Sequence, residues 1–272
     1  MLNAPTILVF DSGLGGLTVF REAVKVRPDA KFVYVADDVF FPYGSHGEAE
    51  LVERIVALMR DLIERQRPDL IVIACNTAST LVLPHLRARF SVPFIGTVPA
   101  IKPACAASVT KRVSVLGTQA TVNREYTRAL IRDFANGSDV TLVGSARLAG
   151  YAETELQGMP VDDAAIRQEI EACFVEDGGR RTDTIVLACT HYPLLLDRFN
   201  RLAPWPVSFL DPAPAIARRV MDLIGPQASP EAPAPATIAF TSGRAPSPAL
   251  AAALSGFGLT TASTIDLPTH SP

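Results

Sequence analysis

The sequence has few cysteines and few lysines. Its four cysteines contain no Cys-x-x-Cys pair, which argues against a zinc knuckle or a redox dithiol. Unpaired thiols are typical of a reducing compartment, so we expect a cytoplasmic protein. The four lysines are Lys25, Lys31, Lys102 and Lys111, and none follows an expected strand directly. This disfavours chemistry through a lysine-bound pyridoxal cofactor.

Strong net charge, long apolar runs and nucleotide-binding loops are also lacking. The net charge of −3 and the absence of a basic stripe predict no nucleic-acid partner. No segment approaches the ~18 apolar residues of a membrane span, and the N-terminus has no signal-peptide pattern. Gly13 and Gly15 fit G-x-G, but Thr18 stands where the third glycine of a dinucleotide loop belongs. We therefore expect neither a membrane nor a nucleotide partner.

Short, continuously apolar segments alternate with helical patterns along the chain. Continuous apolar character is typical of strands buried on both faces of a parallel sheet. The expected strands are 6–10, 32–36, 70–74, 113–116, 140–144 and 184–188. One helical face within 46–66 carries Leu51, Ile55, Leu58 and Leu62. Ser45 and Glu48 form an expected capping box at its start. The alternation predicts an α/β fold with doubly wound, mostly parallel sheets.

Two distant segments have the same pattern, which indicates an internal duplication. Residues 70–83 and 184–196 both run from an apolar strand through Ala-Cys and a polar pair into a helical pattern. We therefore expect two α/β domains that face each other across a cleft, one formed by 1–98 plus 208–272 and the other by 99–207. Residues 225–236 are expected to be a Pro/Ala loop, and 236–243 the last strand before a closing helix.

Cys75 and Cys189 occupy matching places in the duplicated pattern, where a strand ends and a helix begins. The helix dipole is expected to lower the pKa of such a thiol. A thiolate on one side of a substrate carbon can remove its proton while a thiol on the other side supplies a new one, which inverts the stereocentre without a cofactor. Two alternatives stay open: both thiols are inert and buried, as in an amino-acid-binding protein, or Cys189 with His191 serves a hydrolase or acyl transferase.

Polar residues gather at the expected strand ends, the edge where open α/β sheets bind ligands. They are Asp11, Ser12, Tyr43, Gly44, Ser45, Asn76, Thr77, Thr118, Thr190 and His191. A carboxylate there could accept from a substrate ammonium, and hydroxyl, amide and backbone donors could bind carboxylates. Tyr43 could reach a second carboxylate through its hydroxyl. Helix caps and plain turns explain most of these residues equally well when each is taken alone.

Five motifs in this order resemble those of the glutamate racemases. They are FDSGLGGLTV, PYGSHGEAE, ACNTAST, GTQATV and ACTHYPLL, and the resemblance runs from about residue 5 to 215. It implies two α/β domains related by a pseudo-twofold axis, with the active site between them. It also implies racemisation of glutamate without a cofactor or a metal ion, which supplies D-glutamate for peptidoglycan.

The resemblance also implies roles for single residues. Cys75 matches the base for D-glutamate and Cys189 the base for L-glutamate, while Asp11 and His191 match the auxiliary acids beside them. The remaining polar residues named above match substrate contacts. A third auxiliary carboxylate aligns with Glu153, with Glu155 as the alternative. Some members respond to a peptidoglycan precursor. The sequence leaves such activation, and the choice between monomer and homodimer, open.

Overall fold

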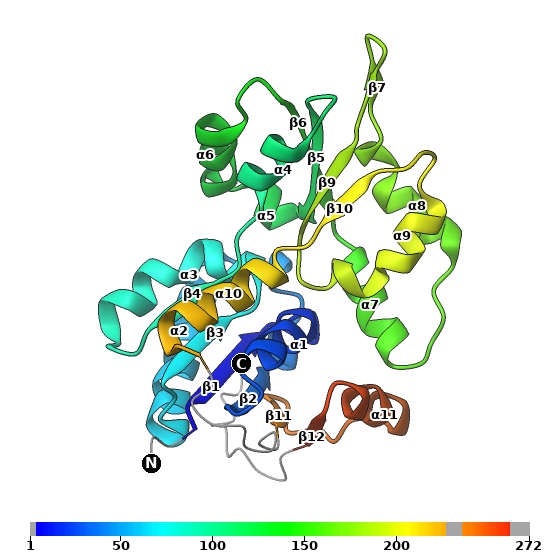
Figure 1. Ribbon diagram of the computed structural model, residues 1–272. Helices are drawn as coiled ribbons and strands as arrows, with labels where there is room; N and C mark the ends of the chain where they lie inside the picture. Colours follow the sequence, from blue (N-terminus) through cyan, green and yellow to red (C-terminus); the bar gives the residue numbers. More distant parts are fainter. Residues whose placement is uncertain (1–3, 227–235, 262–272) are drawn as a thin grey trace.

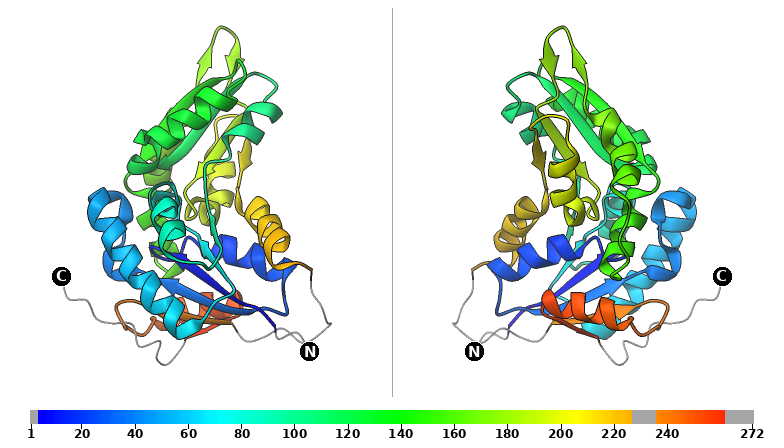
Figure 2. Two further views of the ribbon diagram at one scale, coloured as in Figure 1. Left: turned by 90° about the vertical axis from the view of Figure 1, so that its left-hand side faces the viewer. Right: turned by 90° about the vertical axis from the view of Figure 1, so that its right-hand side faces the viewer.

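The computed structural model describes residues 4–226 and 236–261 and contains two parallel sheets. The first sheet has the order β12-β11-β2-β1-β3-β4 and belongs to what we call the first lobe. Its strands are β1 (Thr6–Asp11), β2 (Lys31–Ala36), β3 (Leu70–Ile73), β4 (Phe94–Gly96), β11 (Ala236–Phe240) and β12 (Leu259–Thr261). The second sheet, in the second lobe, has the order β10-β9-β5-β6. Its strands are β5 (Arg112–Thr118), β6 (Asp139–Ser145), β9 (Thr184–Ala188) and β10 (Ser208–Leu210). The second lobe stands above the first in Figure 1, and the side views show the same arrangement (Figure 2).

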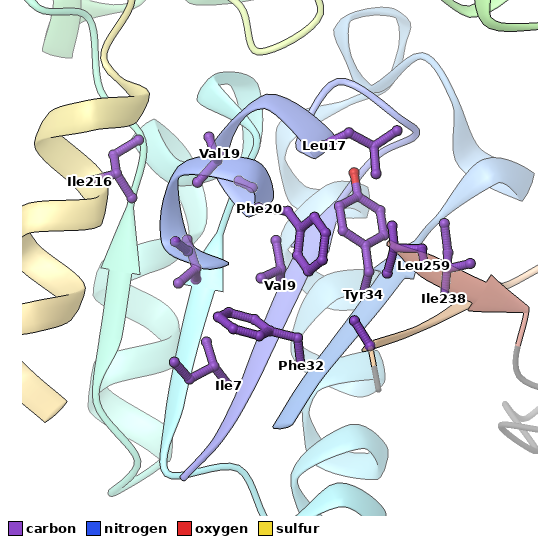
Figure 3. Close-up of a cluster of buried hydrophobic side chains, with 14 of the residues drawn as sticks. Ile7, Val9, Leu17, Val19, Phe20, Phe32, Tyr34, Ile216, Ile238 and Leu259 are labelled. Carbon is purple, nitrogen blue, oxygen red and sulfur yellow. The ribbon is translucent and has the colours of Figure 1, made fainter. Parts of the chain in front are cut away.

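Helices cover both faces of the first sheet because side chains of its strands alternate between two apolar layers. Ile7 and Val9 of β1 pack with one layer, and Leu8 and Phe10 pack with the other. The first layer, drawn in Figure 3, is covered by α1 (Leu17–Val26), α10 (Ala213–Ile224) and α11 (Pro248–Gly256). The second is covered by α2 (Glu48–Gln66) and α3 (Asn76–Arg89). The sheet is therefore doubly wound, as predicted.

The second lobe repeats this construction on a smaller scale. One face of its sheet packs against α7 (Leu148–Leu156), α8 (Asp163–Ile170) and α9 (Leu196–Leu202), and the other against α4 (Ile101–Ala107) and α6 (Glu125–Phe134). Shorter elements are α5 (Gln119–Asn123), η1 (Asp38–Phe40), η2 (Tyr43–Ser45), η3 (Glu171–Cys173) and η4 (Tyr192–Leu195). A hairpin of β7 (Glu176–Asp177) and β8 (Arg180–Arg181) projects at the end remote from the first lobe (Figures 1 and 2).

The six predicted strands and the α/β class are confirmed, while several local predictions need correction. The second sheet includes a further short strand, β10, which pairs with β9. A strand, β12, follows the closing helix and pairs with β11. The expected capping box is wrong: α2 begins after Gly47, and the Ser45 hydroxyl donates to the Pro42 carbonyl inside its own turn. Most of the expected loop at 225–236 lies outside the described residues. The division into two domains at these boundaries stays a prediction.

Within the described ranges 4–226 and 236–261, no helix combines the length and apolar character that a membrane crossing requires.

Candidate active site

The carboxyl ends of the two sheets lie next to each other. Hydrogen bonds that cross directly from one lobe to the other show this. The hydroxyl of Thr18, at the start of α1, donates to the carbonyl of Thr190 after β9 (3.1 Å). The hydroxyls of Thr77 and Thr118, which follow β3 and end β5, lie 3.0 Å apart. Parallel strands bring the residues at their carboxyl ends to one edge. Residues more than 170 positions apart in the chain thus share one site.

Cys75 lies on the first-lobe side of this site and caps the start of α3. Its side chain is 6% exposed, and the thiol donates to the hydroxyl of Ser12 (3.7 Å). Burial raises the pKa of the Cys75 thiol strongly, and the nearby Asp11 carboxylate raises it further. A backbone hydrogen bond from Ala78 at the helix start lowers it by less. The expectation that this pKa is lowered is therefore wrong, because desolvation of the thiolate outweighs the effect of the helix terminus.

Asp11 and Asn76 present buried polar atoms to the same region. Asp11 ends β1 and is fully buried, and its Oδ2 accepts from the backbone N–H of Gly16 (2.9 Å). Burial raises its pKa. Among the described residues, Asp11 Oδ1 and both polar atoms of the Asn76 amide have no hydrogen-bond partner. Leaving a buried polar atom without a partner costs about 1–3 kcal/mol, so such atoms call for an explanation. They indicate that a polar ligand completes the site.

Cys189 lies on the second-lobe side, directly after β9, and is also 6% exposed. Its sulfur is 3.8 Å from Nδ1 of His191, whose Nε2 is 2.8 Å from Oε1 of Glu153. Burial by itself lowers the pKa of His191, but hydrogen bonds to Cys189 and Glu153, and the negative charge of both, raise it well above its ordinary value. His191 is therefore held between the Glu153 carboxylate and the Cys189 thiol, where a hydrogen bond from its Nδ1 can stabilise a thiolate.

Glu153, and not Glu155, joins this side of the site. The backbone N–H of Leu14 in the first lobe donates to Oε1 of Glu153 (2.6 Å), the same oxygen that contacts His191. Glu155 points elsewhere and forms an ion pair with Arg198 of α9. Of the two carboxylates that the sequence left open, only Glu153 lies beside the histidine.

The glycines of SGLGG allow the second lobe to approach this closely. A Cβ at Gly15 would lie 2.6 Å from the backbone N of His191 and closer still to its ring, and a Cβ at Gly13 would meet Glu153. A side chain can rotate away from such a contact, but the backbone of His191 follows a buried strand and cannot. The glycine-rich turn therefore serves contact between the lobes.

We expect Gly15→Ala to reduce the activity of this site by about 10²-fold, because the methyl group pushes His191 away from Cys189 and small misplacements carry costs of that size. Gly137→Ala is the control for a glycine outside the site. A Cβ at Gly137 meets no atom within 4 Å, so this variant adds only the backbone strain that a φ of +79° causes for alanine. The comparison uses turnover and thermal melting of both variants. Full activity of Gly15→Ala would contradict the described contact.

Tyr43 lies at the site, but its hydroxyl is engaged elsewhere. It donates to Oδ2 of the buried Asp37 (2.7 Å), which Arg54 also binds through two hydrogen bonds. The hydroxyl is therefore unavailable for a substrate carboxylate, contrary to expectation. The neighbouring Gly44 does lie next to Thr118, since a Cβ at that glycine would be 3.7 Å from the threonine Cβ. Ser45 is exposed and bonds within its own turn, so the structure does not bring its hydroxyl to the thiols.

Tyr43→Phe should consequently lower stability more than substrate affinity. Removing the hydroxyl leaves the buried Asp37 carboxylate one donor short, at a cost of about 1–2 kcal/mol. Chemical denaturation measures this loss, and KM measures affinity. A large rise in KM with unchanged stability would show instead that the hydroxyl turns to the substrate.

Sequence reasoning missed three further residues of this region. Thr121 is fully buried and extends the hydroxyl cluster of Thr77 and Thr118. Its spacing from Thr118, which caps α5 by accepting from the Thr121 backbone N–H, was the available signal. Asp37 and Arg124 had no local signal, because their partners are remote in sequence. In the part of the chain that the structure describes, no group of three or more His, Cys, Asp or Glu side chains is arranged to hold a metal ion.

Comparison with known proteins places this fold and site in a class. Residues 17–220 match the family model described as Asp/Glu/Hydantoin racemase. The glutamate racemase of Brucella anthropi is 54% identical over 255 residues, which are 93% of this chain and 92% of that protein.

Two solved structures show the same architecture. The Escherichia coli glutamate racemase, in complex with L-glutamate and the activator UDP-MurNAc-Ala, is 39% identical and superposes with a TM-score of 0.83 over 95% of this chain and 97% of its own. The Thermus thermophilus glutamate racemase, in complex with β-chloro-D-alanine, is 29% identical with a TM-score of 0.71 over 96% and 97% of the two chains. The chain therefore belongs to the Asp/Glu/hydantoin racemase family and, within it, to the glutamate racemases.

Proposed function

We propose that this protein interconverts L- and D-glutamate by proton transfer between Cys75 and Cys189, without a cofactor, and so supplies D-glutamate for peptidoglycan. The observation that carries the proposal is that each thiol belongs to a different lobe and has its own polar partner, Ser12 for Cys75 and His191 for Cys189. The two sides meet next to Cys189, since the Thr18 hydroxyl of the first lobe donates to the carbonyl of Thr190. Two acid–base groups on opposite sides of one site are what inversion at a carbon requires.

In the proposed reaction, the Cys75 thiolate removes the Cα proton of D-glutamate, and the Cys189 thiol donates a proton to the opposite face. One S–H bond forms as the other breaks, so the two sulfurs exchange protonation states in each turnover. L-glutamate reacts in the reverse sense. His191, held by Glu153, stabilises the Cys189 thiolate, while Asp11 binds the substrate ammonium, whose positive charge offsets the cost of a buried Cys75 thiolate.

The carbanion formed at Cα needs donors around its carboxylate. The unsatisfied Asn76 amide, the hydroxyls of Thr77 and Thr190 and the backbone N–H groups at the start of α3 are suited to this role, since all are buried and fixed before the substrate arrives. The Thr118 hydroxyl and the backbone at Gly44 are suited to the second carboxylate of glutamate. Donors fixed in a site that excludes water reduce the barrier more than the same donors in water.

The test is an optical assay of dialysed protein, with no cofactor added, started from either glutamate enantiomer. Enantiomers have equal free energy in water, so a racemase brings both reactions to the same equal mixture. A hydrolase or a binding protein leaves the optical signal unchanged, and this outcome would refute the proposal. L-aspartate, one methylene shorter, is the matched control and should react far more slowly.

Two finer proposals follow, one from a relative and one from the cysteines. Because the Escherichia coli enzyme has been solved with the activator UDP-MurNAc-Ala, we include activation by such a peptidoglycan precursor, which assays with and without it measure. A cytoplasmic location agrees with four free cysteines, and localisation of a tagged protein tests it. The choice between monomer and homodimer is decided by analytical ultracentrifugation.

A further inference from the structure

Arg124 is a charged residue of the second lobe whose side chain crosses to the first lobe. It lies between α5 and α6, and its Nη1 donates to the Thr77 carbonyl (2.6 Å) and to the Thr80 hydroxyl (2.9 Å) of α3. Its Nε lies 3.3 Å from a carboxylate oxygen of Glu48, at the start of α2. One guanidinium of the second lobe therefore contacts two helices of the first lobe, α2 and α3.

The charge of Arg124 is costly to bury and is only partly balanced. Its side chain is 9% exposed, whereas that of its ionic partner Glu48 is 67% exposed. Burial lowers the pKa of Arg124, and the charges of Glu48 and of a Cys75 thiolate act in the opposite direction. Interactions between charges are mutual, so the guanidinium also favours the thiolate form of Cys75. Burying a charge to this extent costs free energy unless nearby groups compensate for the lost hydration.

The contact falls on the turn of α3 that begins at Cys75. Thr80 donates in turn to the Asn76 carbonyl (3.1 Å), and the backbone N–H of Ser79 donates to the Cys75 carbonyl (2.8 Å). Thr77, whose carbonyl Arg124 binds, also directs its hydroxyl at Thr118 in the second lobe. Arg124 of the second lobe therefore forms hydrogen bonds to the segment of the first lobe that carries the Cys75 thiol and the unsatisfied Asn76 amide.

We propose that Arg124 is a positioning residue that sets the first turn of α3 when the lobes meet, so that proton transfer at Cys75 depends on the contact between the lobes. This inference rests on the proposed function. The Cys189 side has its own support in His191 and Glu153 and does not use Arg124. The two half-reactions should therefore respond differently to the loss of this one residue.

The test compares Arg124→Met and Arg124→Lys with Arg128→Met, which removes an equal charge from an exposed position on α6. Arg124→Met should lower kcat/KM on the order of 10- to 100-fold. The loss must be equal in both directions, because the equilibrium constant between enantiomers is 1. Arg124→Lys should restore only part of the activity, since an ammonium does not reproduce the planar fork of the guanidinium. Arg128→Met should match the wild type.

Isotope effects separate positioning from a general structural defect. With deuterium at Cα, the primary isotope effect on kcat/KM should rise for D-glutamate, from which Cys75 takes the deuteron, and fall for L-glutamate, for which Cys75 acts only in the second step. The inference would be overturned if the isotope effects were unchanged in both directions, or if both rose or both fell. An equal loss of kcat/KM in Arg128→Met would also overturn it. The proposed function itself fails only if the wild-type protein does not racemise glutamate.

Discussion

The single substitutions Cys75→Ser and Cys189→Ser should each reduce racemisation by about 10³-fold or more. General acid–base catalysis contributes about 10²–10⁴-fold, and a serine hydroxyl is far too weak an acid to take over either proton transfer. Both side chains are 6% exposed, and the exchange removes little volume, so the variants should remain folded. The measurement is the initial rate from each enantiomer together with circular dichroism and thermal melting.

Cys105→Ser is the matched control for a buried cysteine outside the site. Cys105 lies in α4 of the second lobe and is 1% exposed. This variant carries the same chemical change and should keep its activity. Substantial racemisation by either Cys75→Ser or Cys189→Ser would show that one thiol is dispensable, as in a cysteine hydrolase that uses Cys189 alone.

Asp11→Asn should lower activity by about 10²-fold while making the protein more stable. Burial raises the pKa of Asp11 in the folded state, so the folded protein prefers the neutral acid. A group of this kind favours folding below its unfolded pKa of about 3.9, and that contribution is lost as the pH rises through the folded pKa. At neutral pH the buried carboxylate therefore lowers stability. Asparagine removes the charge and keeps an acceptor for the N–H of Gly16.

A gain of about 1 kcal/mol would raise Tm by about 2–4 °C in a protein of this size. The gain should shrink as the pH is lowered toward 4, because Asp11 itself then becomes neutral. Asp69→Asn is the control, since this exposed aspartate accepts from the backbone N–H of Thr6 and should give no gain. A fall in Tm for Asp11→Asn at pH 7 would mean instead that the ionised carboxylate stabilises the folded protein.

The parts of the fold that could be predicted are those encoded in local patterns. Continuous apolar runs predict the buried strands. The duplicated Ala-Cys pattern predicts that both thiols lie at strand ends. β4, β10 and β12 have three residues each, too few to form a pattern. The capping box failed because α2 begins after Gly47, so that Ser45 does not stand at the capping position and its hydroxyl donates to the Pro42 carbonyl within its own turn.

The parts of the site that could not be predicted depend on depth and on remote partners. The pKa of Cys75 follows from its burial in the folded protein and from the Asp11 carboxylate nearby, neither of which the local sequence records. Glu153 and Glu155 differ only in which face of α7 they occupy, and Arg198, from another helix, takes up the second. Asp37 and Arg124 act through residues on other elements, so single charged positions in the sequence gave no sign of them.

The central claim, that two separate thiols serve opposite faces of one carbon, is tested most directly by following deuterium at low conversion. The wild-type protein is incubated with L-glutamate in deuterated water, the reaction is stopped early, and the enantiomers are separated for mass spectrometry. The account predicts deuterium at Cα of the D-glutamate formed and protium in the L-glutamate that remains, with the mirror-image result from D-glutamate. Equal deuterium in recovered substrate and product would mean that one base serves both faces, and would contradict the account.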